Sequence, residues 1–292
     1  MNTPRFRSTV PPSISSFSVI VPVFNLVQDR GSQVILQTLD SIAASIDFFR
    51  ANYPYSQQVE FDLVIVDDGS CDTTLETISA WAKDRSYCQL ISYPRNLGAA
   101  AARNTGVSLT RGQALFFCDG DDRFLPEHIY WGFSILNQPI PARSNSNQPE
   151  YFGAVKTKIR TADCLHPHWQ QAIANTLVLN LCLRREVHDF IQGFPEDEVF
   201  RTFPSGGEDL AYNTWLRKFC HVAQVDQTTV EYIRYPGSQF DRQLTKFQTA
   251  LGEYQDLLSP SEQEQQRAIA TIIQNRLEQL QAKLTNHYSV PK

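Results

Sequence analysis

The segment from Phe17 to Phe24, with the sequence FSVIVPVF, decides the fold class. It is a continuous apolar run rich in β-branched residues, which is typical of a strand buried on both faces of a parallel sheet. The segment after it repeats apolar residues at steps of 4, 3, 4 and 3, the spacing of one helix face. These residues are Ile35, Leu39, Ile42, Ile46 and Phe49. A buried strand followed by an amphipathic helix is the beginning of an α/β fold.

The same alternation continues along the chain. Further strands are expected at Phe61–Val66, Gln89–Tyr93, Ala114–Cys118, Tyr151–Ile159 and Thr176–Leu183. Helices are expected from Ser70 or Asp72 to about Ala82, and at Gly98–Ser108 and Glu208–Phe219. Alternating strands and helices predict a mostly parallel central sheet with right-handed crossovers and flanking helices. Ligands of such sheets bind beyond the carboxyl ends of the strands.

The chain divides into three parts by composition. We expect a disordered leader over residues 1–16, a main domain over residues 17–238 and a helical extension over residues 239–292. The extension is rich in glutamine and carries an apolar stripe of Ile269, Ile273, Leu277, Leu280 and Leu284. This stripe suits packing against the domain or against a second copy, which would make a homo-oligomer through the C-terminal helices. It is too narrow for membrane insertion, although peripheral membrane contact remains compatible with the sequence.

Composition excludes several classes of protein. Of 292 residues, 42% are hydrophobic and 20% are charged, which excludes a disordered or collagen-like chain. The formal net charge is −5, so a dedicated nucleic-acid binder is not expected. No apolar run reaches the roughly 18 residues of a membrane span, and the start of the chain has no apolar signal core. The six cysteines lack metal-type spacing. Reduced thiols and a cytoplasmic location are therefore expected.

Carboxylates follow two of the predicted strands. Asp67 and Asp68 come after one strand, and Asp119, Asp121 and Asp122 after another. At one edge of a sheet these groups would repel one another unless a cation compensates. Oxygen ligands of this kind suit Mg²⁺ or Mn²⁺, and a diphosphate would complete the metal shell. Each pair alone is commonly a helix cap, so their combination carries the inference.

Five blocks of sequence occur in a fixed order. They are Ser18-Val-Ile-Val-Pro-Val-Phe-Asn25, Val66-Asp-Asp-Gly-Ser70, Arg95-Asn-Leu-Gly98 with Ala102-Arg-Asn-Thr-Gly106, Asp119-Gly-Asp-Asp122 and Gly207-Glu-Asp209. In this order the chain resembles a family 2 glycosyltransferase of the GT-A fold over about Phe17 to Ser238. The resemblance implies an inverting transferase with a nucleotide-sugar donor, expected to be UDP-linked, and a hydroxyl acceptor.

The resemblance also implies a role for each matching residue. Pro22, Val23 and Asn25 would contact the nucleotide, Asp67 the uracil ring, and Arg103 the nucleotide and its phosphates. Asp119 and Asp121 match the Asp-x-Asp pair at the nucleotide and the Mn²⁺ or Mg²⁺ ion, with Asp121 as the direct metal ligand. Asp209 matches the general base. These roles agree with the chemistry of transfer. The departing diphosphate gains negative charge, which a metal ion neutralises, and the acceptor hydroxyl loses a proton, which a base accepts. Gly206-Gly207 would let the base close over the donor.

Three places depart from the family pattern. Tyr235 stands where a metal-binding histidine can occur, Gln192-Gly-Phe-Pro-Glu196 is a reduced form of an acceptor loop, and Leu26–Gly31 lacks an acidic residue directly after Asn25. Weaker candidates for the acceptor side are Glu208, Trp131 and Trp215. For Glu208 and Asp209 alone, two acidic residues at a helix start would also be explained by the macrodipole, and tryptophan is usually core material.

Two other functions stay open at this stage. One is a nucleotide-sugar-binding protein without catalysis, against which the presence of Asp121 and Asp209 argues. The other is a sugar nucleotidyltransferase, a class that needs a glycine-rich phosphate loop where this chain has Pro22-Val-Phe-Asn25. The sequence does not specify the sugar, the nucleotide, the acceptor or the choice between Mn²⁺ and Mg²⁺.

Overall fold

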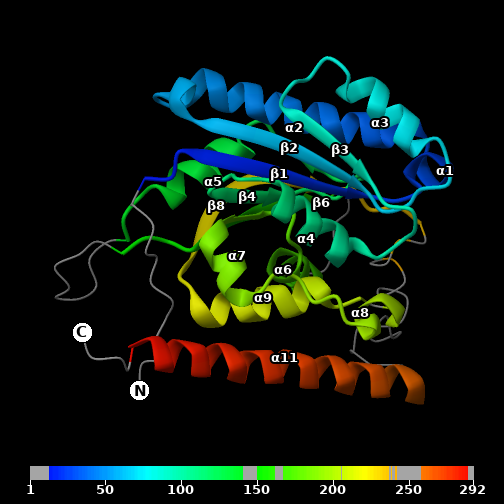
Figure 1. The fold of residues 1–292 in the computed structure, drawn as a ribbon, viewed down its shortest axis with the longest axis vertical. Coiled ribbons are helices and arrows are strands. Elements are labelled where there is room, and N and C mark those ends of the chain that lie inside the picture. Colours follow the sequence, from blue (N-terminus) through cyan, green and yellow to red (C-terminus); the bar gives the residue numbers. More distant parts are fainter. Residues whose placement is uncertain are drawn as a thin grey trace.

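The computed structural model describes residues 13–140, 150–161, 167–204, 206–236, 238, 241 and 258–288. Its centre is an eight-stranded sheet with the strand order β3-β2-β1-β4-β7-β6-β8-β5 (Figure 1). The strands are β1 Ser16–Val23, β2 Glu60–Asp67, β3 Cys88–Ser92, β4 Ala114–Phe117, β5 Arg123–Phe124, β6 Ala154–Thr161, β7 Leu181–Arg184 and β8 Val222–Tyr232. Residues 1–12 of the expected leader and residues 239–240, 242–257 and 289–292 of the expected extension lie outside the described residues. The last part of the expected leader is ordered, since Ile14 is buried and Ser16 begins β1.

The helices flank this sheet. They are α1 Leu26–Arg30, α2 Ser32–Asn52, α3 Thr74–Ala82, α4 Ala99–Leu109, α5 His128–Leu136, α6 Pro167–Thr176, α7 Arg185–Ile191, α8 Glu198–Thr202, α9 Glu208–Phe219 and α11 Pro260–Tyr288, with a short 3₁₀ turn at Ser56–Gln58. In Figure 1, α2 and α3 cover one face of the sheet, and α4, α7 and α9 lie on the other face. This arrangement confirms the predicted α/β class.

The sheet is parallel in its first half and mixed in its second. β1 pairs in parallel with both β2 and β4, and β2 pairs in parallel with β3. β7 then runs antiparallel to β4 and to β6, while β6 and β8 are parallel. The mostly parallel sheet expected from the strand–helix alternation is therefore interrupted by β7, and β5 at the edge of the sheet also runs antiparallel to its neighbour β8.

β7 is also shorter than the strand expected at Thr176–Leu183. Thr176 ends α6, and a turn in which the Leu181 amide donates to the Val178 carbonyl (3.0 Å) precedes the strand. Asn180 stabilises this turn because its side-chain amide donates to the carbonyls of Thr157 at 2.7 Å and Ala174 at 3.3 Å. A polar side chain that bonds to acceptors in β6 and α6 has thus shortened an otherwise apolar run.

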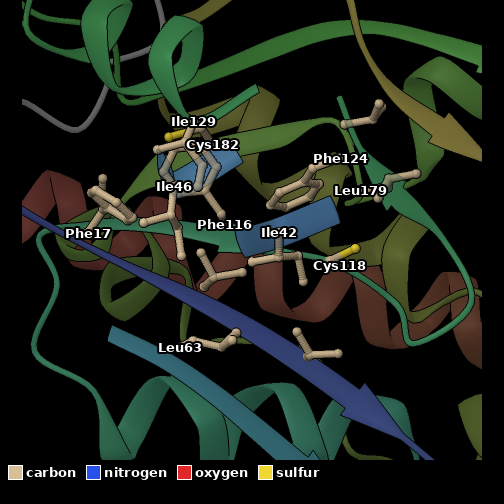
Figure 2. Packing of buried hydrophobic residues seen from close by; sticks show 14 of the residues in the cluster. Phe17, Ile42, Ile46, Leu63, Phe116, Cys118, Phe124, Ile129, Leu179 and Cys182 are labelled. Atoms are coloured by element: carbon tan, nitrogen blue, oxygen red, sulfur yellow. The ribbon is translucent and has the colours of Figure 1, made fainter. Parts of the chain in front are cut away.

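Two hydrophobic cores lie on the two faces of the sheet. Val19 and Val21 of β1 belong to the first core, and Ile20 belongs to the second, as the period of a strand requires. The predicted apolar face of α2 is buried in the first core, where Ile42 and Ile46 lie close to Phe17 and Phe116 (Figure 2). The second core is covered by α4, α7, α9 and α11.

The carboxy-terminal helix α11 packs on the main domain. A capping box begins it, in which the Ser259 amide donates to the Glu262 carboxylate (2.8 Å) and the Glu262 amide donates to the Ser259 hydroxyl (3.2 Å). Of its apolar stripe, Ile269, Leu280 and Leu284 are buried in the second core. For these residues, packing within the chain is the interpretation that the structure supports, and the stripe is not left free for a second copy. No helix among the described residues has the length and apolar character of a membrane span.

Candidate functional site

The site begins where β1, β2 and β4 end at one edge of the sheet. The register pairs Val23 with Asp67 and Ile20 with Phe117, so the residues that follow these strands emerge side by side. Backbone hydrogen bonds continue beyond the strands, from the Asp68 amide to the Val23 carbonyl at 2.8 Å. Parallel strands in this register therefore bring Asn25, Asp67 and Asp119 to the same edge, as the sequence predicted for the carboxylates.

One end of this edge holds four of the residues predicted to contact the nucleotide. Pro22 and Val23 are buried at the end of β1. Asn25 has a left-handed backbone with φ 46°, and its side-chain oxygen accepts a hydrogen bond from the Cys71 amide at 2.8 Å. The buried Asp67 carboxylate accepts from the Ser92 hydroxyl at 2.8 Å and from the Ser70 amide at 3.3 Å. These contacts hold the first and second strand-end loops together.

Asp68 fastens a third loop to the same edge. Its two carboxylate oxygens accept the backbone amides of Leu97 at 2.7 Å and Gly98 at 2.8 Å. Burial raises the pKa of Asp68, against the effect of these two hydrogen bonds. This pairing ties the Arg95–Gly98 block to the end of β2 and sets the position at which α4 begins.

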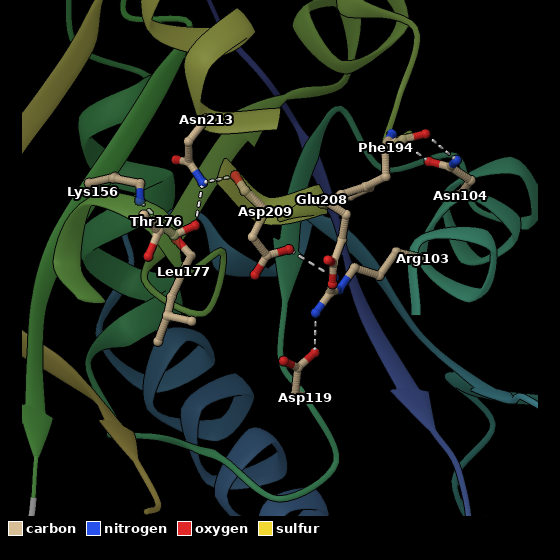
Figure 3. A network of polar contacts seen from close by, with 10 residues as sticks. All are labelled: Arg103, Asn104, Asp119, Lys156, Thr176, Leu177, Phe194, Glu208, Asp209 and Asn213. Atoms are coloured by element: carbon tan, nitrogen blue, oxygen red, sulfur yellow. Dashed lines mark hydrogen bonds and ion pairs between the residues drawn. The ribbon is translucent and has the colours of Figure 1, made fainter. Parts of the chain in front are cut away.

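Arg103 of α4 is the centre of the site. Its Nη2 lies 2.6 Å from Oδ1 of Asp119, and its Nη1 lies 2.9 Å from Oδ1 of Asp209 and 3.7 Å from Oε1 of Glu208 (Figure 3). The side chain is 3% exposed. Burial opposes its charge, but Asp119, Asp209 and Glu208 outweigh burial and raise the pKa of Arg103. A permanently charged guanidinium thus joins the Asp-x-Asp segment after β4 to the start of α9.

Asp209 lies in the first turn of α9, a helix that begins directly after Gly207. Gly207 has φ 121°, a conformation that favours glycine and turns the chain into the helix. Asn213, one turn further on, donates its side-chain amide to the carbonyls of Asp209 at 2.9 Å and Thr176 at 2.7 Å, which fixes α9 against the end of α6. Burial raises the pKa of Asp209 to about 7, although Arg103 opposes the shift. Among the described residues, its Oδ2 accepts no hydrogen bond.

Asp119, Gly120 and Asp121 form a turn that packs tightly on the loop after β1. A Cβ atom at Gly120 would lie 2.4 Å from Cδ1 of Leu26 and 2.8 Å from Cγ1 of Val23, so a side chain at that position would force these neighbours to shift. This close approach brings α1 to the carboxylates, where Nη1 of Arg30 lies 3.1 Å from Oδ2 of Asp121.

The neighbouring carboxylates give this turn an excess of negative charge. Burial and the nearby Asp119 raise the pKa of Asp121 to about 6, and Arg30 opposes that shift. Burial together with Asp121 and Asp119 also raises the pKa of Asp122, whose carboxylate accepts the Ile233 amide at 2.9 Å. Arg30 and Arg103 therefore do not balance the five carboxylates of Asp119, Asp121, Asp122, Glu208 and Asp209.

The implied metal ion would depend on the carboxylates of this turn. Within the described residues, His, Cys, Asp and Glu side chains do not gather in groups of three or more that could hold a metal. Mg²⁺ is commonly held by one or two carboxylates, with substrate phosphates and water filling the rest of its shell. The carboxylates of Asp119 and Asp121, left short of positive charge, fit a cation that arrives with a diphosphate.

A cavity of about 480 Å³ opens beside this cluster. It lies between the start of α4 and the segment around α8, and Glu208 forms part of its wall. Gly98, Ala99 and Arg201 line it as well. Glu208 thus faces both Arg103 and an open space.

The two tryptophans predicted for the acceptor side lie elsewhere. Trp215 has no exposed surface, and its indole N–H donates to the Ile273 carbonyl of α11 at 3.1 Å. The centroids of the Trp131 and Tyr130 rings lie 5.8 Å apart, and the Tyr130 ring also packs against Phe48. Phe48 lies near the carboxy-terminal end of α2, whereas Arg30 lies just before the amino-terminal end of that helix. Trp131 follows the Asp-x-Asp motif closely in sequence, but α5 carries it away from the strand ends.

Three residues of the site were not singled out from the sequence. Arg30 pairs with Asp121, Asn213 orients the Asp209 backbone, and Asn104 binds the Gln192–Glu196 loop. The Asn104 amide donates to the Phe194 carbonyl at 3.0 Å, and its oxygen accepts the Phe194 amide at 2.9 Å. Asn213 stands four residues after Asp209, the helical spacing that signals a shared face. For Arg30, the sequence signal that could have identified it is its position directly after the first strand-end loop.

Comparisons with known proteins agree with this architecture. Residues 18–139 match the family model described as glycosyl transferase family 2. A dodecaprenyl-phosphate galacturonate synthase of Rhizobium johnstonii is 30% identical over 113 residues, which are 38% of this chain and 30% of that protein. The amylovoran biosynthesis glycosyltransferase AmsB of Erwinia amylovora is 28% identical over 125 residues, 42% of this chain and 36% of that protein. The matches thus span about a third of these relatives.

Two solved structures share the fold over most of the chain. TarS residues 1–349 of S. aureus, in complex with UDP-GlcNAc, has a TM-score of 0.60 at 19% identity and covers 93% of this chain and 72% of its own. The mannosyltransferase PcManGT of Pyrobaculum calidifontis, in complex with GDP-Man and Mn²⁺, has a TM-score of 0.51 at 14% identity and covers 99% and 80%. Residues 18–139, from β1 to α5, thus match the glycosyl transferase family 2 model, and the chain has a GT-A-like fold.

Proposed function

We propose that the chain is an inverting glycosyltransferase that moves a sugar from a nucleotide-activated donor to a hydroxyl acceptor. The observation that carries this proposal is the bridge from Asp119 through Arg103 to Asp209. Arg103 thereby has Asp119, in the segment suited to a donor diphosphate, on one side and Asp209, a carboxylate with a raised pKa, on the other. A donor and an acceptor that met at this cation would be aligned for direct displacement.

The donor would lie along the strand ends. Its base would reach the pocket formed by Pro22, Val23, Asn25 and Asp67, in which the Asp67 carboxylate has lone pairs left for a ring N–H. We propose UDP as the nucleotide on this basis, which the UDP-GlcNAc complex of the TarS neighbour supports. The diphosphate would lie at Asp119 and Asp121, beside Arg103.

Asp119 and Asp121 would hold Mn²⁺ or Mg²⁺ together with the diphosphate, with Asp121 as the direct ligand. Such an ion neutralises charge on a departing diphosphate. The Mn²⁺ complex of the PcManGT neighbour supports this assignment. The chain's own contribution is Arg103, whose charge is fixed by three carboxylates and is therefore present throughout the reaction.

Asp209 would be the general base. Its Oδ1 is held by Arg103, and its Oδ2 is left to accept a proton. The acceptor hydroxyl oxygen would attack the anomeric carbon as its proton passes to Oδ2, and the bond from that carbon to the diphosphate oxygen would break. A single displacement inverts the anomeric configuration. The cavity of about 480 Å³ beside Glu208 is large enough for a sugar-sized acceptor group.

A panel of nucleotide sugars tests the proposal directly. Purified protein would be melted with each nucleotide sugar, with and without Mn²⁺, because a bound ligand raises the melting temperature by mass action. A stabilising donor would then be incubated with candidate alcohol acceptors, and the free nucleoside diphosphate would be measured. A donor that binds but is never turned over, alone or with acceptors, would favour the alternative of a nucleotide-sugar-binding protein. Release of pyrophosphate from a sugar phosphate and a nucleoside triphosphate would favour a nucleotidyltransferase.

A further inference from the structure

Arg30 belongs to the charged cluster but has no role in the proposed function. Its Nη1 forms an ion pair of 3.1 Å with Oδ2 of Asp121, and the side chains are 11% and 21% exposed. The other side of the guanidinium is covered by the ring of Tyr235, whose centroid lies 3.1 Å from the guanidinium carbon. The cation is thus enclosed between a carboxylate and an aromatic face, an arrangement that suits arginine in particular.

The backbone holds Arg30 in this place. α1 is only five residues long and lies between Asn25, with φ 46°, and Gly31, with φ 82°. Its first turn is fastened to the loop after β2, since the Val27 amide donates to the Thr74 hydroxyl at 3.0 Å and the Gln28 amide donates to the Asp72 carboxylate at 2.6 Å. Arg30 therefore points at Asp121 from an anchored element and not from a free loop.

Arg30 occupies Oδ2 of Asp121, one of the carboxylate oxygens that a metal ion would use. Mg²⁺ binds carboxylate oxygens at about 2.0–2.1 Å, and a guanidinium 3.1 Å from Oδ2 of Asp121 stands in the way of that approach. A divalent cation beside a guanidinium would also be strongly repelled at such a distance. We infer that Arg30 is a resident counter-cation of Asp121, held by Tyr235, which a divalent cation must displace when it binds with the donor.

This inference rests on the proposed function, because it takes Asp121 as the metal ligand. It predicts that the free chain binds divalent cations weakly and that the cation binds effectively only with the nucleotide. The donor diphosphate would attract both the metal and the released Arg30, which would compensate for the broken ion pair. It also gives a reason for a tyrosine at position 235, where an aromatic ring that stacks on Arg30 replaces a possible metal ligand.

Titration of the free chain with Mn²⁺ in the absence of nucleotide tests the inference, with unbound Mn²⁺ measured by electron paramagnetic resonance. Arg30→Met removes the charge at nearly the same length and should bind Mn²⁺ on the order of tenfold more tightly than the unmodified chain. Tyr235→Leu keeps the charge but loses the stacking, so it should tighten Mn²⁺ binding by a smaller factor. Arg123→Met is the matched control, because Arg123 is a half-exposed arginine paired with Glu231 and outside this contact.

The outcomes separate the inference from the proposed function. Unchanged or weaker Mn²⁺ binding by Arg30→Met, or equal tightening by Arg123→Met, overturns the inference. So does a lack of Mn²⁺ binding by every variant even when UDP is present. Turnover of a nucleotide sugar in the same preparations leaves the proposed function standing in each of these cases. Thermal melting of each variant shows that it is folded, and if Arg30→Met does not fold, Arg30→Gln and Tyr235→Leu carry the test.

Discussion

Asp119 and Asp209 are joined through one guanidinium, since Arg103 binds Asp119 with Nη2 at 2.6 Å and Asp209 with Nη1 at 2.9 Å. Asp119 follows a central strand, and Asp209 begins a helix in the second half of the chain. Their positions relative to each other therefore depend on one buried side chain from a third element, α4. A change in that side chain should alter both halves of the proposed site together.

Arg103→Lys tests this dependence. A lysine keeps the positive charge, but its single ammonium lacks the planar fork with which arginine binds two carboxylates in different directions. We expect kcat to fall by at least about 10²-fold, because the electrostatic support and the position of Asp209 are both lost. Steady-state kinetics with an active donor measures this effect. Arg123→Lys, which changes the half-exposed arginine paired with Glu231, should leave kcat unchanged. Near-normal turnover by Arg103→Lys would refute the bridging role.

Lys156→Met should destabilise the fold beside the site. The Lys156 ammonium is buried and donates to three carbonyls at the end of α6, those of Ala174 at 3.1 Å, Asn175 at 3.2 Å and Leu177 at 2.8 Å. Methionine would leave these acceptors without a donor, and we expect a loss of about 2–4 kcal/mol in the free energy of unfolding. Urea denaturation measures it.

Lys158 on the same strand is the control for Lys156. Its side chain is 60% exposed and pairs with Asp226 at the surface. Exposed ion pairs contribute little, so Lys158→Met should change the free energy of unfolding by less than about 1 kcal/mol. Equal effects of the two substitutions would mean that the carbonyls at the end of α6 find other donors, such as water.

Leu280→Ala tests the packing of α11 on the domain. Leu280 has no exposed surface and lies in the core that also holds Trp215. The cavity left by alanine should cost about 2–5 kcal/mol, whereas Leu277→Ala at a half-buried position should cost less. Thermal melting measures both, and light scattering shows whether the mass in solution changes. A loss of mass with little loss of stability would indicate that the helix serves a contact between copies instead.

The elements that could be predicted from the sequence are those set by local periodicity. The apolar run of β1 and the apolar face of α2 are buried as expected, because a strand or helix with a continuous apolar surface has few other places to go. The alternation of strands and helices also predicted that Asp67 and Asp119 lie at the same edge of the sheet. The resemblance assigned Arg103 and Asp209 to one site, but the contact between them was not predicted from the sequence.

The features that could not be predicted depend on contacts between distant segments. The turn at Asn180 depends on acceptors in β6 and α6, and the pairing of Arg30 with Asp121 depends on the close approach at Gly120. Trp131 seemed close to the site because it follows Asp121 in the sequence, but the direction of α5 decides its position. A single sequence gives the direction of a helix only after its tertiary partners are known.

The pH dependence of transfer should report Asp209. Burial raises the pKa of this carboxyl from its ordinary value of 3.8 to about 7. A general base acts in its ionised form, so kcat/KM should be low below pH 6, rise through about pH 7 and level off above it. Measurement of kcat/KM against pH, at saturating metal and constant ionic strength, would show this rise. A flat profile between pH 5 and 8 would mean that Asp209 does not carry a proton in this range.

Asp209→Asn separates catalysis from structure at this position. Asparagine has the same size and can still accept a hydrogen bond from Arg103 with its side-chain oxygen, but it cannot take a proton from the acceptor. We expect kcat to fall by about 10²- to 10⁴-fold, with the affinity for UDP and Mn²⁺ changed by no more than a few fold, and the pH limb near 7 should disappear from the residual rate. Glu208→Gln, at the neighbouring carboxylate 3.7 Å from Arg103, is the matched control and should retain most of the turnover. If Asp209 instead serves only to begin α9, its substitution should lower the melting temperature and leave kcat intact. A large fall in kcat at an unchanged melting temperature would identify Asp209 as the base.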